Sequence, residues 1–110
     1  MKELEIIRDN CLAREMVTES FPFGEGTLVF KVNEKIFAIL SLQKSYFNIS
    51  LKCNPERACE LREAYPNTIL PGYHLNKKHW NTISFEIEEI SLSLVVELIE
   101  HSYCLVVTKK

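Results

Sequence analysis

The run Tyr46–Cys53 constrains the fold more than any other part of the chain, because its side chains alternate in character. Four apolar residues alternate with three polar ones: Phe47, Ile49, Leu51 and Cys53 with Asn48, Ser50 and Lys52. Since successive side chains of a strand point to opposite faces, this run predicts a strand with one core face and one polar face. A sheet that is apolar on one face needs a second layer to cover that face.

Two further strands are expected before this run, and two after it. They are Leu28–Val32, Lys35–Leu42, Thr68–Leu75 and Asn81–Ile87. Asn33-Glu34 joins the first pair as a tight hairpin, since Asn tolerates the positive φ that such a turn needs. Phe21-Pro22-Phe23-Gly24 is expected to be an ordered turn anchored by its two aromatic residues.

Three helices complete the expected fold. The first covers Lys2–Leu12, with Leu4, Ile7 and Cys11 at helical spacing. The second begins at Asn54-Pro55-Glu56, where Asn caps the free amides and Pro suits the first position, and it stops at Pro66. The third runs over Ser91–Lys109, with Ser91 as its cap and an apolar stripe that includes Ser102. The order α-β-β-β-α-β-β-α predicts an α+β two-layer sandwich, with an antiparallel sheet covered by helices, as one domain over residues 1–110.

Composition excludes several classes of protein. Of 110 residues, 46% are hydrophobic and 25% are charged, as is usual for a globular protein. No apolar run approaches the roughly 20 residues of a membrane span, and the acidic N-terminus lacks a secretory pattern, so a cytoplasmic protein is expected. The four cysteines form no Cys-x-x-Cys pair, which predicts buried or semi-buried reduced thiols and no metal.

Charge is distributed unevenly along the chain. Residues 1–26 contain three basic and six acidic groups, and residues 82–110 contain two basic and five acidic groups. Residues 27–81 contain eight basic and four acidic groups. The net charge of −2 argues against a strongly electrostatic nucleic-acid binder, while the basic middle allows a modest local basic face.

The segment Gly72–Asn81 concentrates the candidate functional side chains. Seven residues are candidate nucleic-acid contacts: Lys52, His74, Asn76, Lys77, Lys78, His79 and Trp80. Lys77 and Lys78 fit either a phosphate clamp, with Lys52 and Arg62 contributing, or a solvated turn. Trp80 fits either a stacking platform or a core anchor. The two His of this segment and His101 are expected to orient structure through hydrogen bonds, because no closed metal-ligand set stands near them.

Several stretches resemble one family in their order and spacing. The stretches are Phe21–Gly24, Leu28–Val32 with Lys35 and Phe37-Ala38, Leu51–Cys53 with Pro55, Ala58, Leu61-Arg62 and Tyr65, then Gly72–Asn81 and Ser102-Tyr103. Together they resemble the bacterial MmcQ/YjbR-like family. The resemblance implies an α-β3-α-β2-α arrangement related to frataxin-like (CyaY-like) domains and secretion chaperones. It also implies DNA binding through two β-hairpins that form a "double wing". The family offers no agreed catalytic residues.

The sequence thus favours a DNA-binding protein whose basic hairpin region makes largely backbone-directed contacts. The alternative is a protein-binding adaptor or chaperone-like module, and a third hypothesis is a small-ligand or redox-sensing domain. The chain has no nucleophile elbow, P-loop or dinucleotide fingerprint, so an enzyme is not expected. We expect a monomer that has no cofactor and does not bind a membrane.

Overall fold

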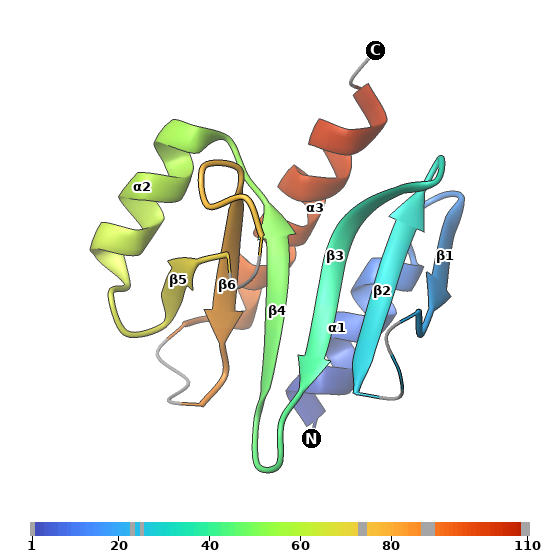
Figure 1. Ribbon diagram of the computed structural model, residues 1–110, viewed down its shortest axis with the longest axis horizontal. Helices are drawn as coiled ribbons and strands as arrows, with labels where there is room; N and C mark the ends of the chain where they lie inside the picture. The colour runs from blue at the N-terminus through green and yellow to red at the C-terminus, as the bar shows by residue number, and fades with distance from the viewer. Residues whose placement is uncertain (1, 23, 25, 73–74, 87–89, 109–110) are drawn as a thin grey trace.

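The computed structural model describes residues 2–22, 24, 26–72, 75–86 and 90–108. Three helices and six strands make up the described chain (Figure 1). In chain order they are α1 (Lys2–Leu12), β1 (Val17–Ser20), β2 (Thr27–Val32), β3 (Lys35–Leu42), β4 (Phe47–Lys52), α2 (Pro55–Ala64), β5 (Ile69–Pro71), β6 (Trp80–Ser84) and α3 (Leu92–Thr108). The α+β class expected from the sequence is confirmed.

All six strands form one antiparallel sheet in the order β1-β2-β3-β4-β6-β5. The central strand β4 pairs Ile49 with Leu40 of β3 and with Ile83 of β6. These three side chains belong to the main core. Because side chains alternate along a strand, Asn48, Ser50 and Lys52 lie on the opposite face.

All three helices contribute to the layer on the core face of the sheet. Ile7 and Cys11 of α1 and Val95 and Ile99 of α3 are fully buried there. Figure 1 shows α1 and α3 behind the sheet, with α2 beside β5 and β6. The other side of the sheet has no helix among the described elements, and we call it the uncovered face. Within the described residues, no helix is long and apolar enough to cross a membrane.

Ser102 of α3 joins the helical layer to an irregularity in the sheet. The β2–β3 register shifts between Phe30 and Lys31, so that Phe37 is an extra residue in β3. The buried Ser102 hydroxyl donates to the Phe37 carbonyl at 2.6 Å and accepts the Lys52 amide at 3.0 Å. The Phe37 ring meets the Tyr103 ring edge to face, with centroids 5.4 Å apart. The residues Ser102-Tyr103 therefore supply a polar and an aromatic contact that fix the bulge.

The expected helix ends and hairpin turn are confirmed. Asn54 Oδ1 accepts the amides of Glu56 and Arg57, and Pro55 opens α2. The Ser91 hydroxyl accepts the amide of Leu94 at the start of α3. Asn33 and Glu34 both have positive φ, 52° and 63°, as a type I′ turn requires.

Four expectations need correction. The short strand β1 was not expected, because Val17-Thr18-Glu19-Ser20 has little apolar content; it makes the order α-β4-α-β2-α. β5 ends at Pro71 and not at Leu75, because the Gly72 amide still donates to the Trp80 carbonyl at 2.9 Å but the Trp80 amide turns to the Asn76 carbonyl inside the loop. Phe21 is 53% exposed, so it does not anchor its turn, and Phe23 lies outside the described residues. β6 ends at Ser84, and Ile87 also lies outside them.

The expectation for the thiols is half correct. Cys11 and Cys53 are buried, and burial raises the pKa of the Cys11 thiol to about 12. Burial also raises the pKa of Cys53, against the opposing effects of Arg57, a hydrogen bond from the Asn54 backbone and Arg62. Cys59 and Cys104 are exposed, contrary to the expectation, because they lie on the outer faces of α2 and α3.

Candidate functional site

Two hairpins and the central strand finish at the same end of the sheet. The antiparallel pairing brings the Asn33-Glu34 turn, the end of β4 at Lys52 and the start of β6 at Trp80 to the same end of the sheet. The described part of the β5–β6 loop, residues 72 and 75–79, lies at this same end (Figure 1). We call this end of the sheet the hairpin end. The sequence predicted both hairpin turns, and the strand order shows that they lie at the same end of the sheet.

Asn76 shapes the β5–β6 loop through both its side chain and its carbonyl. Its Oδ1 accepts the amide of Lys78 at 2.9 Å. Its carbonyl accepts the amides of His79 and Trp80 at 3.2 and 3.0 Å. Because the side-chain oxygen is already engaged, Asn76 serves mainly to form the turn that presents Lys77 and Lys78.

Lys77 and Arg62 tie this loop to its surroundings. The Lys77 amine donates to the Gly72 carbonyl at 3.3 Å. Arg62, on α2, donates from Nη2 to the Lys77 carbonyl at 2.7 Å. Arg62 is therefore a residue that positions the loop, whereas Lys78 is exposed.

The two expected histidines of this segment have different outcomes. His79 is half-buried, and its carbonyl accepts the Cys53 amide at 2.8 Å, which extends the β4–β6 contact beyond the strands. His74 lies outside the described residues, as does Tyr73. No group of three or more His, Cys, Asp or Glu that could hold a metal is found among the residues that the structure describes.

Trp80 lies on the uncovered face and is half-buried. It pairs with Lys52 across β4 and β6, and it is two residues from Thr82 on the same side of β6. A Cβ built on Gly72 would be only 2.8 Å from Trp80 Cβ, so position 72 needs a glycine to lie this close to Trp80. Trp80 is not part of the main core cluster. Lys52 and Trp80 thus form a neighbouring cation and aromatic ring at the hairpin end.

The uncovered face is hollowed into a groove of about 820 Å³. Hydroxyl and carboxamide side chains line much of it: Ser41, Gln43, Asn48, Ser50, Thr82 and Ser84. Apolar side chains line the rest: Ile39, Leu70, Pro71 and Leu75. Thr27 and Tyr46 also line it; among the described lining residues Glu86 is the one carboxylate, and none is a lysine or an arginine. We call this the open-face groove.

The floor of the open-face groove is a buried pair of hydroxyls. Ser50 and Thr82 are 8% and 5% exposed, and their oxygens are 2.9 Å apart in a hydrogen bond. Val29, on the same face, is fully buried. A flat solvated face would expose such residues, so the sheet is concave here. The alternation in Tyr46–Cys53 predicted this polar face, but the groove also needs β6 and the β5–β6 loop, which alternation alone does not place.

The ion pairs of the described residues all use arginine. Arg8 pairs with Glu19, Arg14 with Glu100 and Arg57 with Glu97, at 2.6, 2.9 and 2.7 Å. No described lysine is in an ion pair with another described residue. The acidic groups of α3 are thus partly neutralised on the helical side, while Lys31, Lys52 and Lys78 remain available near the hairpin end.

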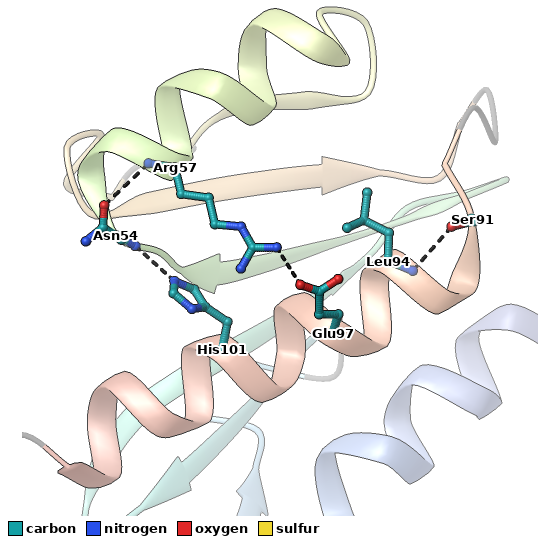
Figure 2. A network of polar contacts seen from close by, with 6 residues as sticks. All are labelled: Asn54, Arg57, Ser91, Leu94, Glu97 and His101. Atoms are coloured by element: carbon teal, nitrogen blue, oxygen red, sulfur yellow. Dashed lines mark hydrogen bonds and ion pairs between the residues drawn. The ribbon is translucent and has the colours of Figure 1, made fainter.

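A polar network joins α2 to α3, as Figure 2 shows. Arg57 reaches down to Glu97, while the Asn54 amide donates to His101 Nε2 at 3.2 Å. Since Nε2 accepts this hydrogen bond, His101 is neutral and carries its proton on Nδ1. Burial lowers the pKa of His101, and the Arg57 charge lowers it further against the opposing effect of Glu97. As expected from the sequence, this histidine orients structure through a hydrogen bond.

The fold and site define an α+β protein with one helical layer, one uncovered concave sheet face and two hairpins that end together. The YjbR family model matches residues 12–105, so this chain belongs to the YjbR family. It is 42% identical over 87 residues to the uncharacterized protein YbdF of Escherichia coli O157:H7, covering 79% of this chain and 70% of that protein. It is 29% identical over 93 residues to the uncharacterized protein YjbR of Escherichia coli K12, covering 84% and 77%.

Two solved structures share this architecture. The Deinococcus radiodurans protein DR2400, a DUF419 domain, superposes with a TM-score of 0.89 at 40% identity, over 96% of this chain and 79% of that one. A Pseudomonas syringae protein superposes with a TM-score of 0.75 at 24% identity, over 96% and 99%, which shows the fold alone. The family resemblance and the fold expected from the sequence are both confirmed.

Proposed function

We propose that this protein binds DNA through phosphate contacts made at the hairpin end. One observation supports this above all: Lys52, at the end of β4, lies at the hairpin end together with Lys31 and Lys78. Lysines at a sheet edge contact phosphates as point charges and fix orientation without reading sequence. The function is binding, and no catalytic role is assigned to any residue.

Charge separation supports a modest electrostatic affinity. The helical side contains the carboxylates of Glu97 and Glu100, which lie across the sheet from the uncovered face. Because only a few phosphates are contacted, we expect weak binding at physiological salt. We also expect a small salt slope, since the slope is proportional to the number of phosphates contacted. A protein with a net charge of −2 can bind DNA in this way, because Lys31, Lys52 and Lys78 lie together at the hairpin end.

Replacing two lysines of the hairpin end tests the proposal. Lys52→Ala combined with Lys78→Ala removes two phosphate contacts, so we expect weaker binding to all duplexes and a salt slope smaller in magnitude by roughly two. Fluorescence anisotropy with labelled duplexes across a salt series measures both quantities. Lys77 is left unchanged because its amine binds the Gly72 carbonyl.

Lys44→Ala is the matched control. Lys44 is exposed in the turn between β3 and β4, at the opposite end of the sheet from the hairpin end. Lys44→Ala also makes the net charge more negative, and we expect this variant to retain the parent's salt slope. A double variant that folds and binds with the parent's affinity and slope would remove the hairpin end from the binding surface.

Protein binding is the second candidate function. Met16 and Phe21 are 76% and 53% exposed, and they flank the edge strand β1. Exposed apolar side chains beside an unpaired strand edge suit a partner that adds a strand. Lack of measurable affinity of the parent for DNA at low salt would favour this adaptor function over DNA binding.

A further inference from the structure

Charge divides the uncovered face into two parts with different recognition chemistry. Lys31, Lys52 and Trp80 lie toward the hairpin end, while the described side chains that line the adjoining groove are uncharged apart from Glu86. A phosphate would be repelled by Glu86 and would find no cation among the described residues that line the groove. A neutral, planar group that can donate and accept hydrogen bonds fits this lining instead.

Nucleobases have this chemistry, and single-stranded DNA offers them unstacked. Carboxamides such as Asn48 both donate and accept, as base edges do, and hydroxyls pair with either. Ile39 and Leu70 provide apolar surface for a ring face or a thymine methyl group. In a duplex the bases stay in the stack, whereas a single strand can place them in a pocket.

The position of Lys52 and Trp80 gives a continuous path for such a strand. Along β4, Lys52 is two residues from Ser50, and along β6, Trp80 is two residues from Thr82, so each is about 7 Å from the groove floor. A strand can therefore contact lysines with its phosphates and extend its bases past Trp80 into the groove.

We propose that the open-face groove binds the bases of single-stranded DNA, while the lysines of the hairpin end hold its phosphates. This inference rests on the proposed function and adds the form of DNA and the location of base contacts. The open-face groove has a volume of about 820 Å³, which falls in the range of roughly 300–1,000 Å³ for pockets that enclose small organic groups. The groove thus has room for bases.

Two oligomers of equal charge separate base contacts from phosphate contacts. One is oligothymidylate of about 12 nucleotides, and the other is an abasic deoxyribose-phosphate oligomer of equal length. We expect the parent to bind oligothymidylate at least about tenfold more tightly, since contacts to a base contribute strongly to single-strand binding. Trp80 is the only tryptophan, so its fluorescence should be quenched by oligothymidylate and not by the abasic oligomer.

Variants assign this preference to the groove. Asn48 and Ser84 are cross-strand partners on its wall, and Asn48→Leu with Ser84→Val removes an amide and a hydroxyl. We expect this variant to bind both oligomers with nearly the abasic affinity. The Lys52→Ala, Lys78→Ala variant should weaken both oligomers by similar factors and keep the preference. Asn67→Leu, at an exposed position outside the groove, is the control and should behave as the parent.

The outcomes distinguish the inference from the function on which it rests. Equal, salt-dependent binding of both oligomers by the parent would overturn the base-binding groove and leave phosphate binding intact. Lack of binding to either oligomer at low salt would overturn both. If the groove variant does not fold, the parent's preference and its Trp80 quenching still decide the matter.

Discussion

Single residues with unusual backbone geometry mark where this chain turns. Asn33 and Glu34 both have positive φ, and Asn33 tolerates this geometry well. Glu34 does not, because its Cβ approaches the following carbonyl in the left-handed region, at a cost of about 1–2 kcal/mol. The turn is retained because pairing of Val32 with Lys35 and the buried β2 and β3 side chains over-determine it.

Glu34→Gly should therefore stabilise the protein. Glycine has no Cβ penalty at this φ, and part of the gain is lost to the greater freedom of the unfolded chain. We expect the free energy of unfolding to rise by about 0.5 kcal/mol or more, measured by urea denaturation. Glu34→Ala removes the same charge and keeps the Cβ, so it should show no such gain. A glycine variant no more stable than the alanine variant would refute this account of the turn.

At the scale of elements, α2 is attached to α3 by groups that respond to pH. The Asn54 cap donates its amide to His101, while Arg57 lies close by and pairs with Glu97. Protonation of His101 would remove the acceptor and add a cation near Arg57 and near the positive end of the α2 dipole. Because α2 also holds the β5–β6 loop through Arg62, loosening α2 would disturb the hairpin end.

Stability should fall as the pH drops below the ordinary His pKa of about 6.5. The pKa of His101 is lowered in the folded protein, so the unfolded chain takes up a proton first and is favoured by acid. The His101 contribution is fully present above about pH 6.5 and is lost as the pH falls through the lower folded pKa. Urea denaturation at about pH 7.5 and about pH 5 should show a larger loss for the parent than for His101→Gln, and equal losses would contradict this role.

At the scale of the whole molecule, the sequence predicted most of the layer structure. Alternation in Tyr46–Cys53 placed Asn48, Ser50 and Lys52 on a polar face, and the Asn54 and Ser91 caps located two helix starts. The sequence pattern did not predict β1. This edge strand pairs with β2 through its backbone and needs little apolar content, as in Val17-Thr18-Glu19-Ser20.

The candidate site was less predictable because it depends on contacts between distant segments. Arg62 and Lys77 are far apart in sequence, and only the fold shows that one positions the other. The hydroxyl pair of Ser50 and Thr82 likewise joins two strands that are not consecutive. Sequence periodicity assigns side chains to faces, but strand order and curvature decide which of them meet.

Amide chemical-shift mapping with oligothymidylate tests the central claim most directly, namely that the uncovered face and hairpin end bind DNA. We expect the shifts to concentrate on β4 and β6, at Asn48, Ser50, Lys52, Trp80 and Thr82, and to diminish as salt rises. The outer side of α3, represented by Ser93, Glu97 and Glu100, should remain unchanged. Shifts that cluster on α3 and leave β4 and β6 unaffected would contradict the account.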